Sequence, residues 1–114
     1  MESARVRMTL TWSVPAGEMR SLAAALHGLM VVTRSEPGCS GCSLSTDLGT
    51  RAVIHYAEDW KTEEDLKRQL RSHRFAVLVE LMEHSTEQPT IEFALADRTR
   101  GLDYAEEVRG SDGG

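Results

Sequence analysis

Apolar and polar residues alternate without a break along residues 6–14, VRMTLTWSV. The apolar positions of this run are Val6, Met8, Leu10, Trp12 and Val14. A period of two predicts a β-strand with one buried face. Pro15 and Gly17 follow and predict its end, because proline cannot donate to a strand ladder and glycine weakens one.

The period then changes to that of a helix. From Ala16 onward the apolar residues recur every three or four positions, and Pro37 predicts that this helix ends before it. Thr62, with an acid three residues later, is a capping box and predicts the start of a second helical segment. We expect that segment to reach about His84, as one helix or a broken pair.

Between the helical segments, residues 42–60 predict a hairpin that turns at residues 47–49. In its second strand one face holds Ala52, Ile54, Tyr56, Glu58 and Trp60, and the other holds Val53, His55, Ala57 and Asp59. Both faces are partly apolar, which predicts cover on both sides. We expect helices on one side and a second copy of the chain on the other. A last strand is predicted over residues 90–96.

The resulting order, β-α-β-β-α-β, predicts an α+β, ferredoxin-like split β-α-β fold with an antiparallel sheet packed by helices. At 114 residues the chain has the length of one domain. We assign residues 1–96 to this domain and residues 97–114 to a C-terminal extension. Leu102, Ala105 and Val108 predict a short helix in the extension, and the polar end, GSDGG, is expected to be loose.

Charge and composition exclude several classes of protein. The chain carries 13 basic and 18 acidic residues, a net charge of −5, which argues against general nucleic-acid binding. No apolar run approaches the roughly 20 residues of a membrane-spanning helix. The N-terminal residues also lack the apolar core of an export signal, so we expect a cytoplasmic protein.

Five short motifs in order resemble the antibiotic biosynthesis monooxygenase (ABM) superfamily. They are EPGC at 36–39, EDW at 58–60, TEEDL at 62–66, SHRF at 72–75 and Pro89, within residues 5–96. The resemblance implies a dimeric α+β barrel, hence a homodimer, with a pocket between each sheet and its helices. It also implies one of several activities: cofactor-independent oxidation of electron-rich aromatic molecules, heme degradation or processing of small signalling molecules.

The same resemblance indicates candidate site residues. Trp60 matches a family tryptophan implicated in substrate binding or oxygen chemistry, and an indole suits stacking on an aromatic ring. Tyr56 and Glu58 share its strand face and are candidates for a phenolic hydrogen bond and a proton acceptor. Arg74 could hold an anionic substrate.

Histidine is the natural base for such chemistry near neutral pH. His55 and His73 are the histidines nearest in sequence to the expected pocket, so they are the candidate catalytic residues. Arg74 and Gln69 stand where relatives often carry histidine. The heme-degrading signature requires asparagine, tryptophan and histidine at three positions, where this chain has Leu10, Gln69 and Val79. Heme degradation is therefore not expected.

Cys39 and Cys42 form a C-x-x-C motif. In an extended strand their Cα atoms would lie about 10 Å apart and the thiols would face opposite ways, which excludes a disulfide without a turn. No second C-x-x-C and no H-x3-5-H spacing completes a zinc site. We interpret both sulfurs as small packing groups after a turn at Pro37 and Gly38.

The sequence therefore predicts a cofactor-independent monooxygenase of the ABM type that acts on a small aromatic or quinol-like molecule, with neither a cofactor nor a metal. The alternative is a non-catalytic ABM-like dimer that binds a small ligand or serves as a scaffold. A dithiol redox protein is a third alternative.

Overall fold

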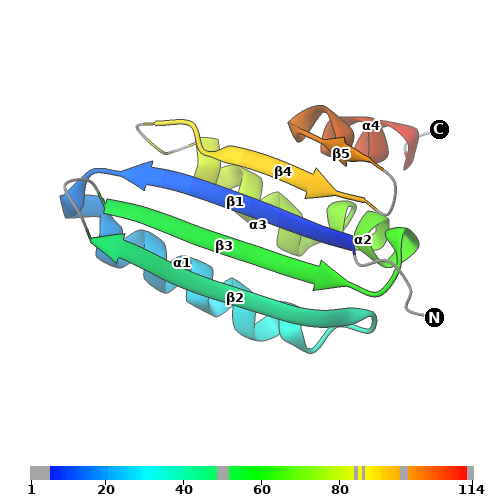
Figure 1. The fold of residues 1–114 in the computed structure, drawn as a ribbon, viewed down its shortest axis with the longest axis horizontal. Coiled ribbons are helices and arrows are strands. Elements are labelled where there is room, and N and C mark those ends of the chain that lie inside the picture. Colours follow the sequence, from blue (N-terminus) through cyan, green and yellow to red (C-terminus); the bar gives the residue numbers. More distant parts are fainter. Residues whose placement is uncertain (1–5, 49–51, 84, 86, 96–97, 113–114) are drawn as a thin grey trace.

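The computed structural model describes residues 6–48, 52–83, 85, 87–95 and 98–112 (Figure 1). Its elements, in chain order, are β1 (Val6–Val14), α1 (Ala16–Arg34), β2 (Cys39–Leu48), β3 (Ala52–Trp60), α2 (Glu63–Leu70), α3 (His73–Glu83), β4 (Thr90–Ala94), β5 (Thr99–Arg100) and α4 (Leu102–Asp112).

The strands form one sheet in the order β2-β3-β1-β4-β5, and every neighbouring pair is antiparallel. β1 lies in the centre and pairs with β3 over its whole length, from Val6 opposite Trp60 to Val14 opposite Ala52. The first four strands with α1, α2 and α3 confirm the ferredoxin-like α+β arrangement. β5 was not predicted, because its two residues have no periodicity and are strand only through pairing with β4.

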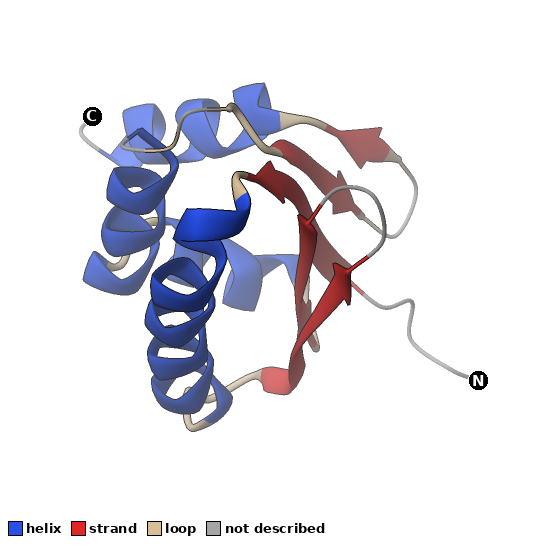
Figure 2. Ribbon diagram, turned by 90° about the vertical axis from the view of Figure 1, so that its left-hand side faces the viewer, coloured by secondary structure: helices blue, strands red, loops and turns tan. Residues whose placement is uncertain are grey.

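All four helices lie on one face of the sheet, and the opposite face carries none of them (Figures 1 and 2). The alternation of β1 follows from this arrangement. Its even-numbered residues are buried against the helices, whereas Arg7 and Thr11 on the bare face are exposed. The core therefore forms a single layer between sheet and helices, and burial of each large apolar side chain there contributes about 1.5–3 kcal/mol.

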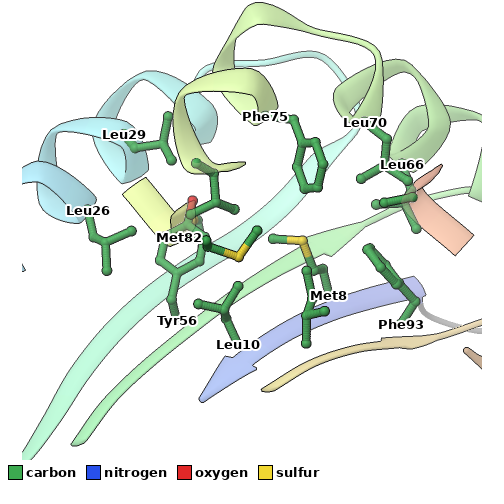
Figure 3. Packing of buried hydrophobic residues seen from close by; sticks show 14 of the residues in the cluster. Met8, Leu10, Leu26, Leu29, Tyr56, Leu66, Leu70, Phe75, Met82 and Phe93 are labelled. Carbon is green, nitrogen blue, oxygen red and sulfur yellow. The ribbon is translucent and has the colours of Figure 1, made fainter. Parts of the chain in front are cut away.

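Figure 3 shows how both layers contribute to this core. Side chains from the sheet meet side chains from the helices at Met8, Leu10, Leu26, Leu29, Tyr56, Leu66, Leu70, Phe75, Met82 and Phe93. Trp12 is fully buried near one end, and its indole Nε1 donates to Ser85 Oγ at 2.8 Å. That hydrogen bond satisfies the only polar atom of the indole.

The chain between α1 and β2 requires glycine at position 38. Gly38 has a φ of +88°, which side chains rarely allow, and a Cβ atom there would collide with the Asp65 carboxylate. Asp65 is held in place because the predicted capping box forms: its backbone N–H donates to Thr62 Oγ1 at 3.1 Å, and the Thr62 backbone N–H donates to its carboxylate. The Thr62 hydroxyl also donates to that carboxylate at 2.9 Å. The EPGC turn and the start of α2 are thus packed together.

Several boundaries differ from the predictions. β2 begins at Cys39 rather than at residue 42, and β4 ends at Ala94 rather than at residue 96. The turn predicted over residues 47–49 starts later, because β2 continues to Leu48 and Asp47 pairs with Val53; residues 49–51 lie outside the described part of the chain. Residues 110–114 were expected to be loose, but α4 continues to Asp112; residues 113–114 lie outside the described part of the chain. Pairing and packing against neighbouring elements outweigh the weak intrinsic preferences of these residues.

The C-terminal extension folds onto its own protomer. Of the three residues that predicted this helix, Ala105 and Val108 are buried, whereas Leu102 is exposed. Tyr104 is also buried and packs its ring 5.2 Å from that of Phe93. The Tyr104 hydroxyl donates to Glu63 of α2 at 2.7 Å. The extension is therefore part of the same hydrophobic core as the rest of the described chain.

Candidate functional site: a buried carboxyl cluster

A carboxyl group lies in the core between the sheet and α2. Glu58, on β3, is a carboxylic acid and yet only 1% exposed; its neighbours on the same strand face are apolar or aromatic. The Tyr56 hydroxyl donates to its Oε2 at 2.7 Å, and the Trp60 indole donates to its Oε1 at 3.1 Å. Because alternate residues of a strand lie on the same face, all three side chains share one face of β3, as the sequence predicted.

Burial raises the pKa of the Glu58 carboxyl above its ordinary value. Hydrogen bonds from Tyr56, Trp60 and Gln69 act in the opposite direction, as does the positive charge of Arg74, and burial outweighs them. A glutamate with a raised pKa holds a proton more tightly than an exposed one and is a stronger base when ionised.

Gln69 connects this carboxyl with the solvent side of the helices. It is 1% exposed and its side chain hydrogen-bonds Glu58, while its Oε1 accepts from Arg74 Nε at 2.9 Å. Arg74 also pairs with Glu36 at 3.2 Å, and both of these charged side chains are partly exposed. A continuous line of polar contacts thus leads from Glu36 at the surface to Glu58 in the core.

The contact of Gln69 with Glu58 was not predicted from the sequence, in which Gln69 only replaces a histidine common in the family. The signal that marks it is its place on α2 between Leu66 and Leu70, which are fully buried. A glutamine on the buried stripe of an amphipathic helix needs a polar partner in the core. Glu58 is that partner.

Both cysteines face this cluster, which corrects the prediction that their thiols point opposite ways. The β2–β3 register shifts between Cys39 and Gly41, so Cys39 pairs with Trp60 and Cys42 pairs with Glu58. The extra residue of this bulge returns Cys42 to the same face as Cys39. Both are free thiols, and Cys42 Sγ lies 3.4 Å from the Tyr56 hydroxyl oxygen. Burial raises the pKa of Cys42 to about 12, so its thiol is protonated at neutral pH.

The two candidate histidines lie away from the cluster. His55 is exposed on the bare face of the sheet, because it is one residue from Tyr56 and strand residues alternate between faces. His73 is exposed at the start of α3 and lines a shallow surface hollow with Ala76 and Glu80. The structure therefore brings together four of the six predicted site residues, Tyr56, Glu58, Trp60 and, through Gln69, Arg74.

The sequence profile of the antibiotic biosynthesis monooxygenase family matches residues 5–89. The chain belongs to this family. No curated protein matches the chain significantly. The family match covers all elements from β1 to α3, so β4, β5 and α4 lie outside it.

Solved structures share the family fold. A conserved protein from Methanosarcina mazei Go1 is 20% identical, with a TM-score of 0.71 over 82% of this chain and 93% of its own. A Deinococcus radiodurans protein, provisionally described as an antibiotic biosynthesis monooxygenase, is 22% identical, with a TM-score of 0.72 over 80% and 91%. A Bacteroides thetaiotaomicron protein of unknown function, suggested to be an oxidoreductase, is 16% identical, with a TM-score of 0.68 over 88% and 99%. At these identities the likeness shows the fold alone.

The cluster of Tyr56, Glu58, Trp60 and Gln69, here called the Glu58 cluster, offers proton-transfer and hydrogen-bonding chemistry. Glu58 can accept or return a proton, and the Tyr56 hydroxyl and the Trp60 indole each donate to one of its two carboxyl oxygens. Among the described residues, no three His, Cys, Asp or Glu side chains gather as a metal-binding group. None of the described helices is both long and apolar enough to span a membrane.

Proposed function

We propose that the protein is a cofactor-independent monooxygenase that acts on a small aromatic or quinol-like substrate, with Glu58 as its proton acceptor. The observation that carries this proposal is the carboxyl buried beside Tyr56 and Trp60, with a raised pKa. Such a group suits removal of a proton from a weakly acidic carbon or phenol in a water-poor site.

For a substrate with an acidic CH2 group, the proposed reaction balances as follows. Glu58 takes one proton, and the resulting carbanion transfers electrons to molecular oxygen and forms a hydroperoxide after the proton returns. The hydroperoxide loses water and leaves a carbonyl. One oxygen atom stays in the product, and the second leaves with the two hydrogens of the CH2 group.

The proposed binding roles follow from the same contacts. Trp60 presents an indole to an aromatic ring, and Tyr56 donates a hydrogen bond to the anion. Arg74 steadies a negatively charged substrate at the partly exposed end of the polar line, where it now pairs with Glu36. We therefore propose that the substrate approaches from this end, by separation of the Arg74 and Glu36 side chains.

The prediction that His55 or His73 is the base remains a prediction. One oxygen-uptake assay distinguishes a histidine base from Glu58 as the base. Oxygen uptake by metal-free and flavin-free protein is measured across a panel of quinols and anthrones. We expect Glu58→Gln to lose uptake, while His55→Ala and His73→Ala retain it. Loss in a histidine variant with retention in Glu58→Gln would reverse the assignment.

A non-catalytic ligand-binding or scaffold protein is the second candidate. It is favoured by the closed state of the cluster: Tyr56, Glu58 and Trp60 are each at most 1% exposed, and their polar groups bond to one another. A satisfied polar network can serve only to specify packing. Uptake by no member of the panel, together with a ligand that raises the melting temperature without turnover, would support this candidate.

We also propose that the chain forms a homodimer through the bare sheet face. Ala57, in the middle of that face, is only 8% exposed, and Val53 is half-buried, so the face is not fully polar. Thr11 lies exposed on the neighbouring strand β1, opposite His55. Light scattering should give a dimer for the wild type and a monomer for Thr11→Arg, whereas a monomeric wild type would contradict the proposal.

The cytoplasmic location stays a prediction that cell fractionation checks.

A further inference from the structure

The C-terminal helix forms one wall of a cavity that is separate from the Glu58 cluster. A cavity of about 390 Å³ lies between α3 and α4. This volume is within the range of small-molecule sites, about 300–1,000 Å³. None of the residues of the Glu58 cluster lines it, and one of its walls is formed by α4, beyond the part of the chain that matches the family profile.

The floor of the cavity is apolar. Phe75, Met82 and Ala105 are almost fully buried, and Val79 is partly buried beside them. These side chains come from both helices and are fixed by the core behind them. The cavity thus offers a preformed surface on which a compact apolar group can be removed from water, a transfer worth roughly 25 cal/mol per Å² of apolar area.

The charged groups on its walls favour a cation. Glu83 is the last residue of α3, where the partial negative charge of the helix end adds to its carboxylate, and Glu106 of α4 provides a second carboxylate. Among the described residues that line the cavity, Arg109 is the one basic side chain. Its guanidinium donates to the backbone carbonyl of Leu70 and lies 5.9 Å from the centroid of the Phe75 ring, so protein groups already engage it.

We propose that this cavity binds a small molecule with a compact apolar body and one protonated amine. The apolar body rests on Phe75, Val79 and Ala105, and the ammonium group lies between the carboxylates of Glu83 and Glu106. An aromatic body gains additional contact with the Phe75 ring. Binding here does not depend on the proposed oxygenase activity.

Three probes that share one ring test the charge requirement: phenethylamine, 2-phenylethanol and phenylacetate. Titration is followed by backbone amide chemical shifts and by melting temperature, since a ligand of the folded state raises it. We expect the amine to bind roughly tenfold more tightly than the alcohol, and phenylacetate to bind most weakly, because two partly screened ion contacts contribute up to about fivefold each. The shifted amides should include those of Val79 and Ala105.

Matched variants locate the site. Glu83→Gln and Glu106→Gln should each weaken amine binding by about two- to fivefold and leave alcohol binding unchanged. Glu64→Gln is the control, because Glu64 is a highly exposed carboxylate on α2 that does not line the cavity. Val79→Phe should narrow the cavity over its apolar floor and weaken binding of all three probes; the glutamine variants keep the test valid if this one fails to fold.

Several results would overturn the proposal. Binding of phenylacetate as tight as that of phenethylamine would remove the charge argument, and shifts confined to residues around Glu58 would place the amine in the other site. Equal weakening by Glu64→Gln would reduce the effect to general charge screening. Since Glu58→Gln should not change amine binding, failure of the oxygenase proposal and failure of this one are separable.

Discussion

Replacing Tyr56 by phenylalanine tests whether the buried Glu58 carboxyl has a raised pKa. The pair of Tyr104 and Glu63 in the same chain serves as the control. Tyr56 and Tyr104 each donate from their hydroxyl to a glutamate at 2.7 Å, to Glu58 and to Glu63 respectively. The two acceptors differ in burial, since Glu58 is 1% exposed and the Glu63 side chain is 30% exposed. Tyr→Phe at both positions removes the same hydroxyl and retains the ring.

The expected losses of unfolding free energy differ because water can replace only one of the lost donors. At Glu58 no solvent reaches the carboxylate, so loss of a hydrogen bond to a charged group should reduce stability by about 1.5–3 kcal/mol. At Glu63, water and Arg98 compensate, and the reduction should be about 0.5–1 kcal/mol.

The pH dependence separates the two sites further. The pKa of Glu58 is raised by burial, so its contribution to stability is fully present below the unfolded pKa of about 4.3 and is lost as pH rises through the folded pKa. Tyr56→Phe removes a bond that lowers this pKa, and the loss then extends to higher pH. The pKa of Glu63 is lowered, first by Tyr104, so its contribution is present above about 4.3 and is lost only as pH falls through the folded pKa.

Urea unfolding followed by circular dichroism, at fixed protein concentration between about pH 5 and pH 8, measures both effects. The cost of Tyr56→Phe should grow with pH, with a slope limited to about 1.4 kcal/mol per pH unit for one proton. The cost of Tyr104→Phe should stay constant over this range. Equal and pH-independent costs for both variants would refute a buried Glu58 with a raised pKa.

Three further changes have defined outcomes. Glu58→Gln should flatten the fall of stability with rising pH above about pH 4.3, and an unchanged slope in urea titrations would show that another group causes it. Gly38→Ala should lower unfolding free energy by about 1–3 kcal/mol, because of its positive φ and the collision with Asp65, and wild-type stability would contradict this. Trp12→Phe should lower the melting temperature, because it removes the hydrogen bond to Ser85, about 0.5–1.5 kcal/mol of unfolding free energy, and leaves a void in the core; a melting temperature equal to that of the wild type would contradict this.

The elements with one buried face could be predicted from sequence because their periodicity reports that face directly. β1 has the predicted bounds, Val6–Val14, and α1 begins at Ala16 as expected. The break after Leu70 separates α2 from α3 at the SHRF motif. The bulge near Cys39 and the strand at Thr99 could not be found this way, since both depend on pairing with a distant strand and leave no period in the sequence.

The part of the candidate site that lies on β3 could be predicted from the sequence. The contacts that other elements make with it could not. Alternation alone places Tyr56, Glu58 and Trp60 together, because they lie on one strand. Gln69 and Cys42 reach Glu58 and Tyr56 through the docking of α2 and the register of β2, which are tertiary facts. His55 was predicted as a catalytic residue because it is close in sequence to Tyr56. Strand geometry, however, directs its side chain to the opposite face of the sheet.

Stability alone does not account for a carboxyl at position 58. A leucine there would continue the buried face of β3, whereas removing a carboxylate from water costs several kcal/mol that its hydrogen bonds return only in part. The compensating groups come from three directions: Tyr56 and Trp60 along the strand, Gln69 from α2 and the charge of Arg74 from α3. Because several elements cooperate to hold one group that weakens the core at neutral pH, the departure from an apolar pattern supports the proposal that Glu58 acts as a proton acceptor.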